Sequence, residues 1–168
     1  RSYIRLDAEP IIERTYYGSM YVFGCCVRVG KYPVGYNGFP VNDNVQGGGD
    51  YHWNYNNEAL FYGACSANRV DLCEPYDRTV LEANVFGQRH AKATDVPGTV
   101  FFIATGPGHL NEAVTLGQRT HAVEASLNLI TRFYMTYDLE WTKAMYPFFK
   151  DVAAYWDQDL LKNKEIRA

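Results

Sequence analysis

Apolar residues recur at intervals of three and four positions along most of this chain, which is the spacing of amphipathic helices. The first such stretch runs from Glu9 to Val29. Pro10 suits a first helical turn, and Gly30 suits a C-terminal stop. One face of this predicted helix carries Ile12, Tyr16, Met20, Phe23 and Val27.

The same spacing predicts four more helices. Asn54 or Asn56 caps a helix that runs to about Ala67, and further helices cover roughly 72–94, 116–137 and 139–162. The last one has an apolar side formed by Trp141, Met145, Phe148, Val152, Tyr155 and Trp156. The break at Tyr137-Asp138 is short, so the last two helices should form an antiparallel hairpin.

The segments between the helices add little regular structure. Residues 31–49 are rich in Gly, Pro and Asn and predict a long loop, and 99–105 is a short strand candidate. A βαβ alternation is missing from the pattern. We therefore expect one mainly α domain over 1–168, built of α/α hairpins with long loops and at most one short β element.

Composition and charge argue against several classes of partner. The net charge is −3 and no basic run exceeds a pair, which argues against nucleic acid. No apolar run approaches a membrane span, since FFIA at 101–104 reaches only five residues even with Val100 before it. The four cysteines and four histidines lack zinc-ligand spacing, so we expect no metal and no cofactor. Spacing alone does not decide whether Cys65 and Cys73 form a disulfide.

Candidate chemistry concentrates in DYHWNYNNEALFY at 50–62. If the segment is extended, Asn54 and Asn56 point the same way and their amides can hold a water or a sugar hydroxyl. If a helix has already begun, Asn54 shares a face with Glu58 instead. The alternative is that Asp50 or Asn54 only caps the helix and that the aromatic residues belong to the core.

Two other side chains of this stretch have two interpretations each. His52 is a ligand or base in one, and a satisfied structural histidine in the other. Glu58 is a candidate general acid, because a carboxyl group in an apolar helix has a raised pKa. More commonly such a glutamate is paired or solvated.

The order of these motifs resembles the catalytic domain of six-hairpin glycoside hydrolases, most closely the inverting 1,2-α-L-fucosidase type. Four motifs carry the resemblance, which spans about residues 10–163. They are VGKY at 29–32, the DYHxNxN motif at 50–56 followed by Phe61-Tyr62, the NxxxLxEP pattern at 68–75, and YPFFKDVAAYW at 146–156.

The resemblance implies a carbohydrate partner and a place for each residue. Asn54 and Asn56 would position the attacking water, while Asp50 and His52 brace the loop. Trp53 or Tyr55 would stack on the sugar ring, while Glu58 is a substrate-binding candidate on its chemistry alone. Trp53, Tyr55 and Asn57-Glu58 depart from the family pattern, which leaves the sugar open.

The resemblance also implies that the chain is a fragment or a reduced relative. The family's general acid and base lie past the matched region, and a full toroid needs on the order of 280 residues. The exposed helix faces of a part-toroid would favour homo-oligomers. A secreted or periplasmic location follows if the resemblance holds. The alternatives are a non-catalytic carbohydrate-binding domain and a helical interaction domain.

Overall fold

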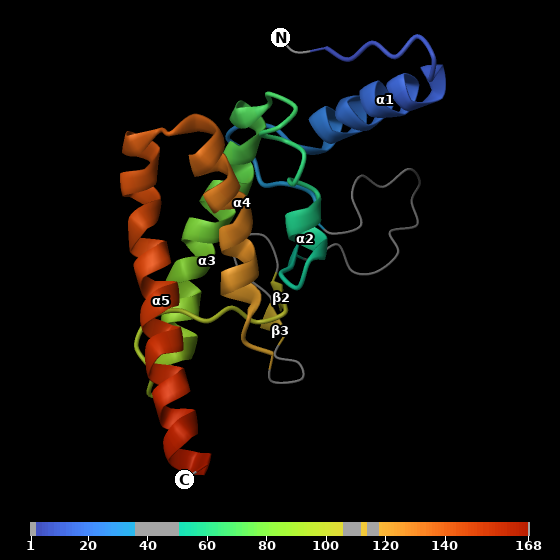
Figure 1. The fold of residues 1–168 in the computed structure, drawn as a ribbon. Coiled ribbons are helices and arrows are strands. Elements are labelled where there is room, and N and C mark those ends of the chain that lie inside the picture. Colours follow the sequence, from blue (N-terminus) through green and yellow to red (C-terminus); the bar gives the residue numbers. More distant parts are fainter. Residues whose placement is uncertain (1–2, 36–50, 106–111, 114–117, 168) are drawn as a thin grey trace.

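The computed structural model describes residues 3–35, 51–105, 112–113 and 118–167 (Figure 1). Helices dominate this part of the chain, as the sequence predicts. They are α1 Pro10–Cys26, α2 Asn56–Ala59, a 3-10 helix at Val70–Cys73, α3 Glu74–Ala93, α4 His121–Thr136 and α5 Leu139–Arg167. The strands β1 Tyr51–His52, β2 Ala104–Thr105 and β3 Glu112–Ala113 have two residues each.

The body of the molecule is formed by α3, α4 and α5, which lie side by side (Figure 1). The predicted hairpin of the last two helices is confirmed. Tyr137 ends α4 in the left-handed conformation with φ 49°. Asp138 then starts α5, because its carboxylate accepts the Trp141 N–H at 3.0 Å. The predicted apolar side of α5 faces the core, with Met145, Phe148 and Tyr155 buried.

Asp151 on α5 connects this helix to α3 and to the chain that follows α3. Its carboxylate accepts hydrogen bonds from Asn84 at 2.9 Å and Gln88 at 2.7 Å, both on α3. Its carbonyl accepts the Thr99 N–H at 3.1 Å. Gly98 lies so close to α5 that a Cβ there would be 2.2 Å from the Asp151 carbonyl oxygen. The chain after α3 is therefore fixed along α5.

The β structure differs from the single strand predicted at 99–105. The Thr99 and Val100 N–H groups donate to Asp151 and to Gly87 in the neighbouring helices, so they are not available to a strand ladder. Only Ala104–Thr105 pairs, between β1 and β3, with Tyr51 opposite Thr105 and Ala104 opposite Ala113. Three short antiparallel strands replace the single one.

Two helix predictions also need correction. The helix expected to reach Ala67 ends at Ala59, because most of the following turns are closed by hydrogen bonds three residues apart, such as Phe61 N–H to Glu58 O at 3.0 Å. The first helix ends at Cys26 instead of Val29, since Val27 is extended. No residue of α1 is buried, and the helix projects from the body in Figure 1.

Candidate functional site

The candidate site begins with a strand that is anchored in the core. Tyr51 and Trp53 are buried on the same side of the chain, and the Trp53 N–H donates to Ile103 O at 2.9 Å. The Trp53 ring lies against Tyr51, Tyr76 and Phe101, with centroids 5.4–6.2 Å apart. Its exposed fraction is 0%. Trp53 is therefore a core residue, and the ring stacking expected of it is left to Tyr55.

The chain then turns sharply before α2. Residues 53–55 form a turn, so the extended conformation that would align Asn54 with Asn56 is wrong. Tyr55 has φ 106° and ψ −45°, a region that a residue with a side chain seldom adopts. This turn leaves the Tyr55 ring 60% exposed and in edge contact with Tyr62, which is 46% exposed.

Beneath these two rings, α2 buries unusually polar side chains. Asn57 and Glu58 are both fully buried. The Glu58 Oε2 accepts the Tyr55 N–H at 3.1 Å, while its Oε1 has no hydrogen-bond partner in the described chain. The same holds for the Asn54 Oδ1 and for both amide atoms of Asn57. Four buried polar atoms within five residues thus lack partners, which is costly for a folded protein.

Burial also sets the protonation of this site. It raises the pKa of Glu58 from 4.5 to about 8, and the negative charge of Glu124 on α4 adds to the effect. Glu58 therefore holds its proton at neutral pH. Burial and the same carboxyl groups raise the pKa of Tyr62. The protein thus places a protonated carboxyl group close to a second, partly exposed one.

Helix α4 supplies the opposite wall. The Asn128 Nδ2 donates to Glu58 O at 2.9 Å, and the Tyr76 hydroxyl donates to Ala125 O at 2.8 Å. Sequence reasoning missed Glu124 and Asn128, although they are four apart and so share a helix face. It also missed Asn57, whose burial depends on where α2 begins.

The other residues predicted for the site, His52, Asn56 and Asp50, lie apart from this group or outside the described chain. His52 lies in β1 opposite Ala104 and is half-buried, and Asn56 is the half-buried first residue of α2. Asp50 lies outside the described residues. The structure thus brings Asn54, Tyr55 and Glu58 together with two unpredicted neighbours, Tyr62 and Glu124.

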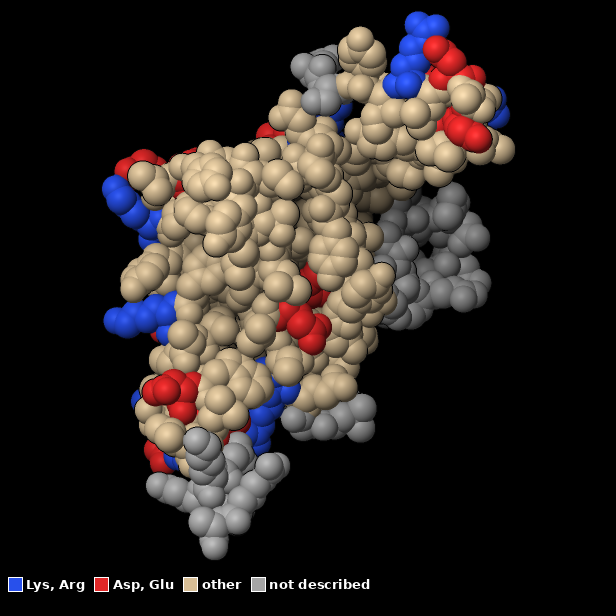
Figure 2. Space-filling model, viewed as in Figure 1, with Lys and Arg blue, Asp and Glu red and all other residues tan. Residues whose placement is uncertain are grey.

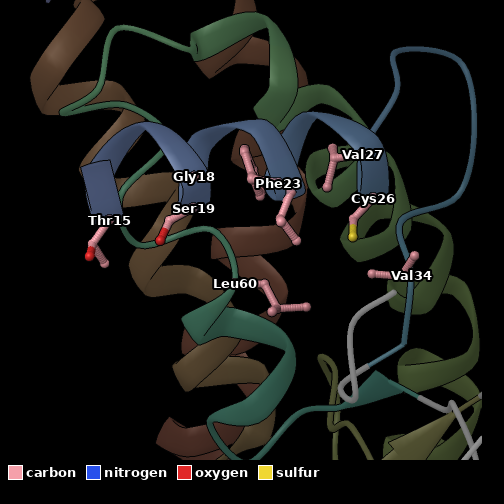
Figure 3. A pocket seen from close by; sticks show the side chains of 9 residues that line it. Thr15, Gly18, Ser19, Phe23, Cys26, Val27, Val34 and Leu60 are labelled. Atoms are coloured by element: carbon pink, nitrogen blue, oxygen red, sulfur yellow. The ribbon is translucent and has the colours of Figure 1, made fainter. Parts of the chain in front are cut away.

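An apolar cavity lies elsewhere in the described chain. It measures about 490 Å³ and lies between the lower side of α1 and Leu60 (Figure 3). Its lining is largely apolar and uncharged, and comprises Thr15, Gly18, Ser19, Val22, Phe23, Cys26, Val27, Val34 and Leu60. Because it offers few polar groups, this groove suits an apolar side chain better than a sugar.

No protein-family model and no curated protein matches this chain. In the part of the chain that the structure describes, no three His, Cys, Asp or Glu side chains are grouped so as to hold a metal ion. Nor do the described helices include one that is both long and apolar enough to cross a membrane.

Proposed function

We propose that this chain is a glycoside hydrolase-like domain that binds a carbohydrate over residues 54–62, next to α4. The observation that supports this most is the group of unpaired buried atoms on Asn54, Asn57 and Glu58. A sugar presents many hydroxyl groups, each both donor and acceptor, and can supply partners for amide and carboxyl groups alike.

The exposed tyrosines give the proposed site its apolar side. Tyr55 and Tyr62 present ring surface beside the polar atoms. Sugar rings have apolar faces formed by C–H groups, so an aromatic ring next to amides suits them. Asn54 positions a hydroxyl or a water in this proposal, and the protonated Glu58 donates to a sugar oxygen.

The same residues permit a catalytic version of the proposal. An inverting glycosidase needs a protonated carboxyl group and an ionised one on opposite faces of the sugar. Glu58 fits the acid, and Glu124 is the neighbouring carboxyl group that a base requires. In this version α3, α4 and α5 form part of an α/α toroid.

Binding is tested by calorimetric titration of the purified chain with L-fucose, D-galactose, D-glucose and D-xylose. We expect heat with at least one sugar, and loss of most of the affinity in Asn54→Ala and Tyr55→Ala. Tyr146→Ala is the matched control, because Tyr146 is equally exposed on α5, away from the site. If no sugar binds, or if the control weakens binding equally, the proposal is wrong.

Catalysis is tested separately with aryl glycosides. Turnover that Glu58→Gln abolishes, while sugar binding remains, identifies Glu58 as the acid. Binding without turnover leaves the domain a carbohydrate-binding module.

A second candidate function is self-association through α1, which we infer from its exposure. Ile11 and Tyr21 are 70% and 75% exposed, and residues 15–27 carry no charge on any side. A helix that is uncharged all round is normally covered. A second copy of this chain offers the same uncharged surface over residues 15–26, so two copies can pair there without burying a charge.

A further inference from the structure

Two cysteine thiols face each other next to the candidate site. The Cys65 Sγ lies 3.5 Å from the Cys73 Sγ, and both cysteines are in the thiol form. Cys65 belongs to the turns that follow α2, and Cys73 is the last residue of the 3-10 helix before α3. Neither the proposed sugar site nor the fold requires a thiol at these positions.

The backbone between the two cysteines holds them in place. The Asn68 N–H donates to Cys65 O at 2.9 Å, and the Arg69 N–H donates to Ala64 O at 2.8 Å. Asn68 adopts φ 57°, a left-handed turn that asparagine tolerates well. The connection therefore folds back on itself. Rotation of the two side chains can close the remaining sulfur–sulfur distance without rebuilding the chain.

The two thiols differ in reactivity. The hydrogen bond with Cys73 lowers the pKa of the Cys65 thiol, and the positive charge of Arg132 helps. The same hydrogen bond and burial raise the pKa of Cys73. Cys65 is half-buried and Cys73 buried. Because Cys65 is the more accessible thiol, a small disulfide reaches it first, and the buried Cys73 is the resolving thiol.

We propose that Cys65 and Cys73 are a redox modification site, at which a low-molecular-weight disulfide converts the two thiols to a reversible disulfide. The Cys65 thiolate attacks one sulfur of the small disulfide, forms a mixed disulfide and releases a small thiolate. The Cys73 sulfur then attacks Cys65, and the second small thiolate leaves with the Cys73 proton. Two electrons pass from the protein to the small molecule, which ends as two thiols.

The consequence falls on the segment that carries Tyr62. A bond between positions 65 and 73 closes a short loop, and fixes residues after α2 to the beginning of α3. Asp77, in the first turn of α3, pairs with Arg132 on α4, so the fixed end is already attached to the body. The inference rests on the thiol geometry and is independent of the sugar proposal.

The test equilibrates the reduced protein with oxidised glutathione, followed by mass mapping under non-reducing conditions. We expect a cross-linked peptide that joins Cys65 to Cys73, reversed by excess reduced glutathione. The thermal unfolding temperature should rise by roughly 5–10 °C on oxidation, because the disulfide reduces the conformational entropy of the unfolded chain. Cys73→Ser should instead accumulate a stable glutathione adduct at Cys65.

Cys25→Ser is the matched control, because Cys25 is a half-buried cysteine on α1. It should retain both the cross-link and the thermal shift. A wild-type map without a Cys65–Cys73 peptide, or with only glutathione adducts at these positions, overturns the proposal. That map needs no variant, so poor folding of Cys73→Ser does not affect it.

Discussion

A single carboxyl group, that of Glu58, dominates the electrostatics of the candidate site. It is fully buried, one of its oxygens is unpaired, and its pKa is raised to about 8. The unfolded chain releases this proton near its ordinary value of 4.5. The native state therefore binds the proton more tightly, so the Glu58 contribution to stability is present below pH 4.5 and falls as the pH rises towards 8.

Glu58→Gln should remove this dependence, because glutamine resembles the protonated acid. Relative to wild type, the variant should gain at most about 4 kcal/mol in free energy of unfolding between about pH 5 and about pH 9. Urea unfolding at both pH values measures it. Glu140→Gln, at an exposed first-turn position of α5, is the control and should keep the wild-type pH profile. If the stability of wild type and of Glu58→Gln changes with pH in the same way, the raised pKa of Glu58 is wrong.

The backbone at Tyr55 gives a second prediction at this scale. A φ of 106° is comfortable for glycine and strained for any residue with a Cβ. Tyr55→Gly and Tyr55→Ala both remove the ring, so the difference between them isolates the backbone. We expect the glycine variant to be more stable than the alanine variant by about 1–2 kcal/mol. Thermal unfolding of the pair measures it, and equal stabilities would place the residue in an ordinary conformation.

Among the helices, one polar cluster joins α3, α4 and α5. The Asp77 carboxylate on α3 accepts hydrogen bonds from the Arg132 guanidinium on α4 and, at 3.0 Å, from the Trp141 indole on α5. The guanidinium also lies over the Trp141 ring, 4.7 Å from its centroid. Burial raises the pKa of Asp77 to about 7, and outweighs the lowering effect of Arg132.

Arg132→Ala should cost about 3–5 kcal/mol, because it leaves a buried carboxylate without its partner. The loss should grow above about pH 7, where the wild-type carboxylate is ionised and the variant still has to bury that charge. Arg89→Ala is the matched control. That arginine is exposed on α3 over the Phe86 ring, and its removal should cost under about 1 kcal/mol. If both variants lose the same free energy of unfolding, the Asp77–Arg132–Trp141 cluster does not contribute specially to the stability of the three helices.

Helix prediction from sequence succeeded where periodicity and packing agree. The apolar side of α5 is long and regular, so its burial could be inferred before any contact was known. Prediction failed at α2, where the choice between turns closed over three residues and a continuous helix is set by local geometry. For Trp53 the sequence left two interpretations, a sugar-stacking ring or a core residue, because the burial of an aromatic residue depends on segments as distant as Tyr76 and Phe101.

The candidate site was predictable only in its linear part. Asn54, Tyr55 and Glu58 are adjacent in sequence, and their residue types signalled polar chemistry. Glu124 and Asn128 join them through the packing of α4 on α2, which no local pattern contains. The resemblance to six-hairpin glycosidases spans about residues 10–163, includes this motif and stays a prediction.

The side of the molecule seen in Figure 2 is largely uncharged, with acidic and basic atoms in separate groups along the left edge, near the centre and at both ends. Helix α1 extends from it with exposed Ile11 and Tyr21. Exposed apolar residues also occur on the hairpin, at Tyr134, Met135, Tyr137, Leu139 and Tyr146. Two surfaces are therefore available for self-association, and they can be distinguished.

We expect the chain to form dimers through α1, measured by light scattering after gel filtration. Tyr21→Glu should shift the molecular mass to that of a monomer, because it places a charge in the centre of the helix pair. Tyr146→Glu puts the same charge on α5 and should leave the dimer intact. If Tyr146→Glu gives a monomer and Tyr21→Glu does not, the interface lies on the α4–α5 hairpin. A monomeric wild type would exclude both interfaces.

Gly98 limits how this chain can vary. Its φ of 93° and its closeness to the Asp151 carbonyl leave no room for even a methyl group, and the obstacle is main chain that no side-chain substitution removes. A library randomised at this codon and selected for folded protein should return glycine almost alone. The path of the backbone therefore restricts this position to glycine, whichever side chains surround it.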